Sequence, residues 1–345
     1  MRHLKLTRRT FGRTALGAAA AAALTAGLPA FAAGGDYPRK LRIGSTAPGH
    51  LKFVVFRNLG LLEKAFADEG VEVEYLTFDG GSAASVALGS GQLDLMYTGN
   101  NPALRLAASG ADVKAIGLSA WVPQNDTLVI VPTDSAPQTL GDLKGRRVAY
   151  LVGTVRHSVF SKALASVGLS TADVESFNFG IENSGPAMSR GDIDAIVESS
   201  GVAQKLVDAG AARVLFDASG NPEWSVPYII TGNGGFLRQY PQVATRLLEE
   251  DIRLAKWVDA HPEETIGIFV KETGNAEKSV RATYKDDVFY QDPEITDAAV
   301  EALKGEEAFM AANGLIKGKV DYDAWIDRSF YAAAVAGLAA APGTY

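Results

Sequence analysis

The sequence predicts an α/β protein built from two similar lobes with a ligand cleft between them, followed by C-terminal helices. Short β-like runs alternate with helical periods from about residue 39 to about residue 234, which predicts parallel sheets covered by helices. A motif that recurs 100 residues later suggests that this region holds two copies of one arrangement. After residue 236 the apolar spacing becomes helical.

Ten apolar or alternating runs are expected to be strands. They are residues 41–44, 71–78, 93–97, 113–118, 127–132, 147–150, 174–179, 195–198, 213–216 and 228–232. Helices are expected between them at residues 53–69, 83–89, 102–109, 157–167 and 202–209. Further helices are expected at residues 240–259, 263–272, 276–285, 295–313 and 328–338, with proline-containing breaks at His261-Pro262 and Gln291-Asp292-Pro293.

The repeated motif joins a helix end to a strand. Ser90-Gly91-Gln92-Leu93-Asp94-Leu95 recurs as Arg190-Gly191-Asp192-Ile193-Asp194-Ala195, and in both copies the glycine fits a left-handed helix cap. The strands expected at residues 41–44 and 147–150 also run into similar turns, Ser45-Thr46 and Gly153-Thr154. We therefore expect lobe 1 at residues 33–124 plus 228–345, lobe 2 at residues 125–227, and hinges near residues 121–127 and 221–228.

Polar turns rich in serine, threonine, asparagine and glycine follow several of the expected strands, and each begins a helix. Ligands of open α/β sheets bind at the carboxyl ends of strands, and helix N-termini offer N–H donors and a partial positive charge. Two lobes that face each other would combine these turns into an oxyanion site; alternatively, the side chains only cap their helices. The candidate ligand-binding residues of the turns are Ser45, Thr46, His50, Gly81, Ser82, Thr98, Asn100, Asn101 and Thr154.

Five further residues are candidates for the same cleft. Arg156, at an expected helix start, either forms a two-pronged bond to a sulfonate or carboxylate or is an exposed arginine. Glu198 ends an apolar strand, where it takes a ligand amine or pairs with Arg156 or a surface lysine. Trp121 either forms an apolar wall or packs in the core. The other two are Ser199 and His157, which is more often a hydrogen-bond partner of a helix start than a catalytic base.

Composition argues against several classes of function. The chain has no cysteine, so it has no disulfides, thiolate metal sites, cysteine nucleophile or lipid-anchored N-terminal cysteine. Its formal net charge of −7 disfavours nucleic acid and anionic membranes as partners. His50, His157 and His261 lie far apart and in no metal-binding spacing, so we expect neither a metal nor another cofactor, and no catalytic residues are assigned.

The first 32 residues have the pattern of a twin-arginine export signal. Arg8-Arg9 in a basic segment is followed by an uncharged apolar run at residues 15–28 and by Ala30-Phe31-Ala32, a small-x-small cleavage pattern. The apolar run is too short to cross a bilayer core. We expect cleavage near Ala32 and export of the folded chain without a lipid anchor. Loss of the five basic residues of this segment changes the formal net charge from −7 to −12.

Several segments match motifs of one known family. The more specific are Tyr97-Thr98-Gly99-Asn100 and Gly153-Thr154-x-x-His157, whereas Leu140-Gly141-Asp142-Leu143-Lys144-Gly145 is common to many binding proteins. Others are Leu41-Arg42-Ile43-Gly44, Gly60-Leu61-Leu62-Glu63-Lys64, the second copy of the repeated motif, and His261-Pro262-Glu263-Glu264. With these motifs in order from about residue 39 to 330, the chain resembles the aliphatic-sulfonate, taurine and nitrate-binding proteins of ABC importers.

The resemblance implies a type II periplasmic binding fold, in which two lobes close on a ligand and deliver it to a membrane permease driven by a separate ATPase. It implies a monomeric periplasmic protein without enzymatic activity, whose turns at residues 45–46, 98–101 and 154–157 hold an anionic head group. The alternatives are a binder of nitrate, bicarbonate or a pyrimidine precursor, a sensor that docks on a receptor, and an enzyme on the same fold. Desulfinating enzymes of similar fold use a cysteine, which this sequence lacks.

Two departures from the family pattern bear on the ligand. Val155-Arg156 replace the small residues usual before the histidine of the second-lobe turn, and Glu198-Ser199-Ser200-Gly201 stand where relatives often have Trp-Asp-Pro. Loss of an aromatic ring and gain of a carboxylate predict a remodelled cleft wall. We therefore expect a ligand with both an anionic group and a polar or cationic part, as in taurine.

Overall fold

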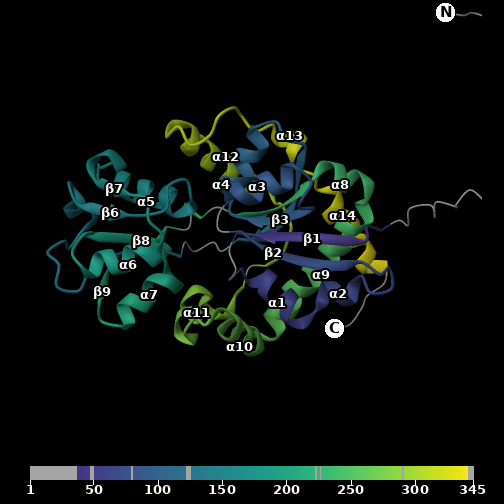
Figure 1. Ribbon diagram of the computed structural model, residues 1–345, viewed down its shortest axis with the longest axis horizontal. Coiled ribbons are helices and arrows are strands. Elements are labelled where there is room, and N and C mark those ends of the chain that lie inside the picture. The colour runs from purple at the N-terminus through teal and green to yellow at the C-terminus, as the bar shows by residue number, and fades with distance from the viewer. Residues whose placement is uncertain are drawn as a thin grey trace, which may run out of the picture. The chain divides into compact units, whose positions relative to one another are not determined.

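The computed structural model of the protein describes residues 37–46, 50–78, 81–121, 126–221, 224–225, 227–289 and 291–340. The expected export signal and its cleavage site lie outside these residues. Within them the chain forms two five-stranded sheets, each with helices packed against it (Figure 1). No helix in this described part of the chain is both long enough and apolar enough to cross a membrane.

The first sheet has the strand order β2-β1-β3-β10-β4. Its strands are β1 Lys40–Ser45, β2 Glu72–Thr77, β3 Leu95–Thr98, β4 Val113–Ala120 and β10 Tyr228–Asn233. The helices that connect them are α1 Leu51–Leu59, α2 Leu61–Ala65, α3 Gly81–Gly89 and α4 Asn100–Ala108. Alternate residues of β3 serve two hydrophobic clusters, Leu95 and Tyr97 on one face and Met96 on the other, as the two-residue period of a strand requires.

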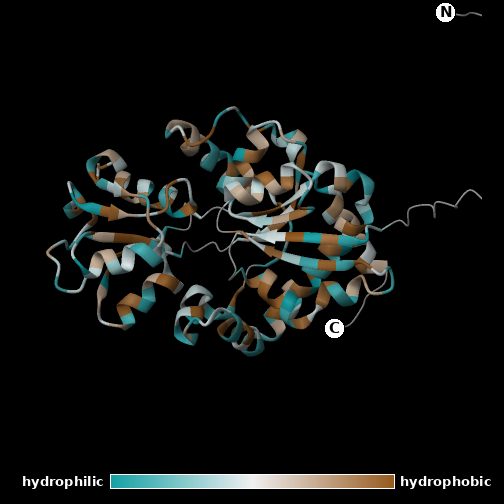
Figure 2. Ribbon diagram, viewed as in Figure 1, coloured by the Kyte–Doolittle hydropathy of each residue, from teal (hydrophilic) through white to brown (hydrophobic). Residues whose placement is uncertain are grey.

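The second sheet repeats this topology with the order β7-β6-β8-β5-β9. Its strands are β5 Thr127–Pro132, β6 Arg147–Ala149, β7 Glu175–Phe177, β8 Ala195–Ser199 and β9 Ala212–Asp217. Its helices are α5 Val155–Ser166, α6 Ile181–Ser189 and α7 Ser200–Asp208, with short 3₁₀ turns at Leu140–Leu143, Thr171–Asp173 and Ala218–Gly220. Every residue of β8 is buried, and Figure 2 shows hydrophobic colour over part of this central strand, whose last two residues are polar.

The C-terminal part of the chain is helical and packs mainly on the first sheet. Its helices are α8 Gly234–Gln239, α9 Pro241–Ala260, α10 Pro262–Thr273, α11 Glu277–Thr283, α12 Asp297–Ala312, α13 Tyr322–Trp325 and α14 Ser329–Ala340, with a 3₁₀ turn at Lys285–Asp287. Helix α9 buries Leu247, Leu254 and Val258 on one face against the cluster that includes α1. Helix α12 buries Leu303 and Met310 in the cluster on the opposite face of the sheet.

Both sheets are mixed, which corrects the expectation of parallel sheets. Strand β10 runs antiparallel to β3 and β4, and β5 runs antiparallel to β8 and β9. Tyr228, the first residue of β10, pairs with Ala120, the last residue of β4, and Thr127 pairs with Ser199 in the same way. Each of these strands therefore enters its sheet at the carboxyl edge of the parallel strands and must run back against them.

The repeated motif has the same structure in both copies. Gly91 and Gly191 have φ angles of 73° and 78°, as expected for left-handed helix caps. Asp94 accepts hydrogen bonds from the backbone N–H and the guanidinium of Arg42, and Asp194 accepts the equivalent bonds from Arg147. The aspartate of each copy thus ties the start of one strand to the start of its neighbour.

All ten expected strands are present, each within two residues of its expected ends. The expected helix at residues 53–69 is two helices, because Gly60 takes a left-handed conformation with φ 60° between α1 and α2. Helices α8 and α13 are additions to the expected set. Helix α6 was expected only as a helix end before Gly191, and Pro186 within it explains why its composition gave no bounds.

Helices of the C-terminal part also contact the helices of the second sheet. The Ser158 hydroxyl in α5 donates a 2.6 Å hydrogen bond to the fully buried Glu306 carboxylate in α12, and Nζ of Lys162 lies 3.4 Å from the same oxygen. Between α7 and α11, the hydroxyls of Ser200 and Thr283 lie 3.2 Å apart. These contacts set the second-sheet helices, including their N-terminal turns, against elements that belong to the first sheet.

Candidate functional site

Several buried polar atoms without partners in the described part of the chain lie where strands of the first sheet end, and others, such as those of Glu69, Ser184 and Ser279, lie elsewhere. Among the described residues, no hydrogen-bond partner is present for either ring nitrogen of His50, for the Thr98 hydroxyl or for the Trp121 indole N–H. The same holds for Nδ2 of Asn100 and for both polar side-chain atoms of Asn101. Folded proteins seldom leave buried polar atoms unpaired, so this cluster indicates a place where a ligand supplies the missing partners.

The turn from β3 into α4 places the two asparagines. Gly99 is extended at the helix start, and Oδ1 of Asn100 accepts a 2.7 Å hydrogen bond from the Asn101 N–H. Both asparagines are fully buried. Asn100 therefore has a structural bond through its oxygen and an unused NH₂ group, whereas the whole Asn101 amide is unused.

The turn from β6 into α5 places Thr154 and His157. Thr154 is the N-cap residue of α5, and its hydroxyl donates to the Leu151 carbonyl oxygen at 2.7 Å. Nδ1 of His157 accepts a 3.2 Å hydrogen bond from the Gly153 N–H, and its ring stacks on Tyr150 with centroids 5.1 Å apart. Burial lowers the pKa of His157. The structure thus shows the predicted alternative for His157, a neutral hydrogen-bond partner of the helix start.

Arg156 and Glu198 form an ion pair within the second sheet's turns. Nε of Arg156 lies 2.5 Å from Oε2 of Glu198, and the same oxygen accepts a 2.6 Å hydrogen bond from the Ser199 N–H. Burial disfavours the charged Arg156, but the nearby charges of Glu198 and Asp126 outweigh it and raise its pKa. Of the roles considered for Glu198, the structure shows the pairing with Arg156, which holds the guanidinium in place.

The turns of the two sheets meet at α4 and α5. A Cβ added to Gly99 would lie 3.9 Å from Cγ2 of Val155, and one added to Gly153 would lie 3.0 Å from Nη1 of Arg105. The face of α4 that carries Arg105, together with the preceding Gly99, therefore lies next to residues 153–155, the turn that begins α5. Two helix N-termini with unpaired donors lie next to each other there, which is the arrangement expected for binding an anion.

The remaining candidates are spread more widely. Ser45 is buried at the end of β1, and the Thr46 N–H donates to the Tyr97 carbonyl oxygen at 3.4 Å. A Cβ on Gly81 would overlap Pro102, so this glycine permits α3 to pack on α4. Trp121 packs against a core cluster, as its alternative role predicted, and Ser199 is the buried N-cap residue of α7. Ser82 is exposed on α3, and no described contact joins it to the other candidates.

A buried network beneath the site was missed from the sequence. The rings of Tyr97 and Tyr228 lie 6.0 Å and 6.2 Å from that of His50, and the Tyr97 hydroxyl donates to Asp251 at 3.2 Å. Nζ of Lys52 lies 3.2 Å from Asp251, and both side chains are fully buried. A charged residue within the apolar run at residues 51–56 was the one available signal, and its partner is about 200 residues away.

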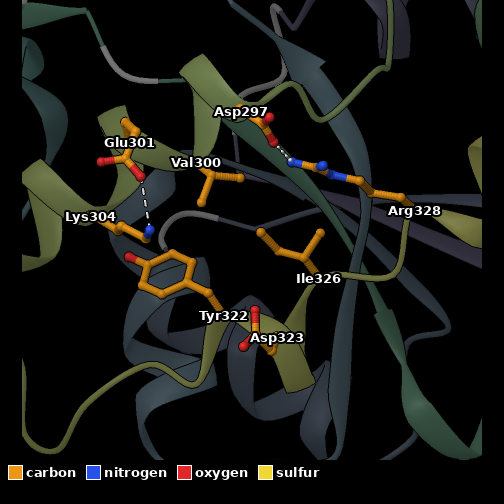
Figure 3. Close-up of a pocket in the computed structure, with 8 residues that line it drawn as sticks. All are labelled: Asp297, Val300, Glu301, Lys304, Tyr322, Asp323, Ile326 and Arg328. Carbon is orange, nitrogen blue, oxygen red and sulfur yellow. Dashed lines mark hydrogen bonds and ion pairs between the residues drawn. The ribbon is translucent and has the colours of Figure 1, made fainter.

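A surface pocket of about 450 Å³ lies apart from this site, between α12, α13 and the segment that leads into α14. Figure 3 shows that its charged side chains largely satisfy one another. Arg328 pairs with Asp297 at 2.7 Å, and Lys304 pairs with Glu301 at 2.8 Å and lies over the Tyr322 ring. The turns, by contrast, present polar atoms that have no partner among the described residues.

Acid is expected to destabilise the protein through His50. Burial lowers the pKa of His50 to about 3, whereas a histidine in the unfolded chain has a pKa of about 6.5. As the pH falls below 6.5, the unfolded chain binds a proton that the folded state refuses, so stability is lost between pH 6.5 and 3. The wild type should lose about 2 kcal/mol more than His50→Leu between pH 7 and pH 5. Urea unfolding at both pH values measures this difference, and equal losses would contradict it.

No group of three or more potential metal-ligating side chains is present within the described ranges. The site offers amide, hydroxyl, indole and guanidinium donors, together with two neutral histidines and one paired carboxylate. Such a set suits a ligand rich in acceptor oxygens.

Comparisons with known proteins identify a family. The family profile described as NMT1/THI5 like matches residues 50–265, more than half of the chain. An Escherichia coli protein named for the binding of aliphatic sulfonates is 29% identical over 182 residues, which are 53% of this chain and 56% of that protein. A Bacillus subtilis protein with the same name is 26% identical over 314 residues, which are 89% of this chain and 92% of that protein. The chain thus spans little more than half of the first relative and most of the second.

Solved structures share the fold. The periplasmic aliphatic sulphonate binding protein SsuA from Escherichia coli matches with a TM-score of 0.73 at 22% identity, over 86% of this chain and 99% of SsuA. The desulfurization enzyme DSZB matches with a TM-score of 0.71 at 17% identity, over 87% of this chain and 99% of that enzyme. Together with the two mixed sheets, these matches confirm the predicted periplasmic binding protein fold.

Proposed function

This chain belongs to the NMT1/THI5-like family, and we propose that it is the solute-binding component of an ABC importer that captures a small organic sulfonate. The names of its relatives support the sulfonate class. The observation that carries the proposal is the group of buried, unpaired polar atoms at the start of α4, next to the start of α5.

A sulfonate matches these atoms chemically. Its three oxygens are acceptors only, and the turns present donors: the NH₂ groups of Asn100 and Asn101, the Thr98 hydroxyl and two helix N-termini. A sulfonate is ionised at every physiological pH, so it needs no proton from His50 or His157, whose pKa values burial lowers. Bicarbonate, nitrate and pyrimidine precursors are the competing ligands for the test below.

Glu198→Gln is expected to weaken the binding of all sulfonates by a similar factor. Glu198 holds Arg156, so its replacement frees the guanidinium from a fixed position. We expect about a tenfold loss for both taurine and ethanesulfonate, typical of a charge-assisted hydrogen bond. Isothermal titration calorimetry of the wild type and the variant gives the loss of affinity for each ligand, and the ratio of the two losses tests the prediction. A loss confined to taurine would show that Glu198 takes the ligand amine, one of the roles that the sequence left open.

The proposal also covers the cellular location and the partners of the protein. We propose a monomer that reaches the periplasm by the twin-arginine route, is cleaved near Ala32, and delivers its ligand to a membrane permease. We also propose that it is not an enzyme. The sequence has no cysteine for the covalent chemistry of desulfinating enzymes, and the histidines of the site are buried and neutral.

A thermal-shift screen tests the proposed function. The mature protein is unfolded and refolded to remove bound ligand, then heated with taurine, alkyl and aryl sulfonates, nitrate, bicarbonate, aminopyrimidines and small carboxylates. A ligand at 100 times its dissociation constant stabilises the protein by about 2.7 kcal/mol. We expect the largest shifts with sulfonates. A shift confined to nitrate, bicarbonate or a pyrimidine precursor would replace the proposal with that ligand class.

A further inference from the structure

Arg105 in α4 is a half-buried cation with no described counter-ion. Among the described residues its guanidinium makes neither an ion pair nor a hydrogen bond, not even to the carbonyls of the last turn of α4. Burial lowers the pKa of Arg105, and no acid offsets that effect. By contrast, Arg42, Arg147, Arg156 and Arg246 each lie within ion-pair distance of a carboxylate.

The Arg105 guanidinium lies against the turn that begins α5. Gly153 has a φ of 76°, and a Cβ there would lie 3.0 Å from Nη1 and 4.0 Å from Cζ of Arg105. The arginine therefore crosses from a helix of the first sheet to a turn of the second sheet. This turn is the N-terminal end of a 12-residue helix, which carries a partial positive charge. A cation at this end of the helix is unfavourable unless an anion lies nearby.

Asn101 provides a second, independent sign of a ligand at the same place. Asn101 and Arg105 are four residues apart and so lie on the same face of α4. The Asn101 amide is fully buried, and both of its polar atoms lack partners among the described residues. An unused amide, an unpaired guanidinium and a helix N-terminus thus border the contact between α4 and residues 153–155.

Charge balance distinguishes Arg105 from the other cations near the site. Arg156 is neutralised by Glu198, Lys52 is neutralised by Asp251, and Asp126 adds a negative charge near Arg156. The site therefore has no surplus positive charge unless Arg105 supplies it. No described carboxylate pairs with Arg105, whereas Glu198, which lies at the first turn of α5, is occupied by Arg156.

We propose that Arg105 is a specificity-determining residue that binds the anionic head group of the ligand between α4 and the first turn of α5. The inference rests on the proposed function for the sulfonate nature of that group. The negative charge of that group follows from the guanidinium of Arg105, which has no counter-ion among the described residues.

The test compares Arg105→Gln and Arg105→Lys with the control Arg238→Gln, which removes an exposed arginine paired with Asp112. Dissociation constants for ethanesulfonate are measured by titration at low and high salt. We expect Arg105→Gln to weaken binding at least tenfold and to reduce the salt dependence of binding, Arg105→Lys to retain part of the affinity, and the control to match the wild type. Without ligand, Arg105→Gln should unfold at the same or a higher temperature than the wild type.

Unchanged affinity in Arg105→Gln would overturn the proposal, and a lower unfolding temperature with unchanged affinity would assign Arg105 a packing role. If the wild type binds no sulfonate, the proposed function fails, and inorganic sulfate at millimolar concentration then tests Arg105 separately. A sulfate-induced rise in the unfolding temperature that is present in the wild type and absent in Arg105→Gln supports the assignment. Equal rises in both proteins contradict it.

Discussion

Replacing Lys52 by methionine is expected to lower the free energy of unfolding by about 3–5 kcal/mol, because it leaves a buried carboxylate without its cation. Nζ of Lys52 lies 3.2 Å from Asp251 and donates a 2.9 Å hydrogen bond to the Leu118 carbonyl oxygen. Burial raises the pKa of Asp251 to about 6, so this carboxyl is still ionised at neutral pH and depends on Lys52. Urea unfolding at pH 7 measures the loss.

The double variant Lys52→Met with Asp251→Leu is the control. It removes both charges, and apolar replacement of a complete buried pair costs far less than the loss of one partner. We therefore expect the double variant to recover most of the lost stability. A loss of stability below about 1 kcal/mol in the single variant would show that the buried Asp251 carboxylate does not depend on Lys52. The network matters for function because Tyr97, which donates to Asp251, directly precedes Thr98 at the end of β3.

Asn101→Leu is expected to weaken ligand binding about 10- to 100-fold and to leave the stability of the ligand-free protein unchanged or raised. A hydrogen bond to a charged group contributes about 1.5–3 kcal/mol, and that contribution is lost with the amide. The ligand-free protein loses no hydrogen bond in this variant, since both polar atoms of the buried Asn101 amide are unpaired among the described residues. Titration calorimetry and thermal unfolding measure the two effects separately.

Asn233→Leu is the matched control, with the opposite result expected. Oδ1 of Asn233 accepts from the Phe236 N–H at 3.0 Å, and its Nδ2 donates to the Leu88 carbonyl oxygen at 2.9 Å. Loss of this helix cap should cost about 1 kcal/mol or more of stability and leave ligand affinity unchanged. If Asn101→Leu behaved like Asn233→Leu, Asn101 would be a structural residue and the assigned site would lose its best-placed donor.

The strands could be predicted because most are short apolar or alternating runs bounded by turn-forming residues such as glycine, proline, asparagine, aspartate and serine. Residues 127–132 are the clearest case. They are mostly β-branched and apolar, and the expected strand has the same ends as the observed β5. The direction of β5 and β10 could not be predicted in the same way. It depends on which edge of a sheet the chain enters after leaving the other sheet, and no local pattern records that.

Helix α6 shows where local signals fail. Its Pro186 and Gly185 disfavour a helix, yet Ala187 and Met188 on its inner face are buried in a core cluster of the second sheet. Tertiary packing therefore outweighs the local preference. In the same way, Gly60 looked like one residue of a long helix but ends α1 in a left-handed conformation.

The residues of the candidate site that lie in turns after strands could be predicted from the sequence. The contacts between residues far apart in the sequence could not. Polar residues directly after strands pointed to Thr98, Asn100 and Asn101. Their lack of partners could not be read from the sequence, nor could the pairing of Arg156 with Glu198 be chosen over its alternatives. Arg105 resembles an ordinary basic residue in the last turn of a helix, and its isolation emerges only when the neighbouring turn at Gly153 is placed.

A crystal structure of the mature protein with ethanesulfonate is the most direct test of the central claim that the α4 and α5 turns bind an anionic head group. The account predicts sulfonate oxygens within hydrogen-bond distance of the Asn101 amide and the Arg105 guanidinium, next to the first turn of α5. A sulfonate bound elsewhere, for example between Lys304 and Arg328 in the pocket beside α12, with the Asn101 amide still unpaired, would contradict it.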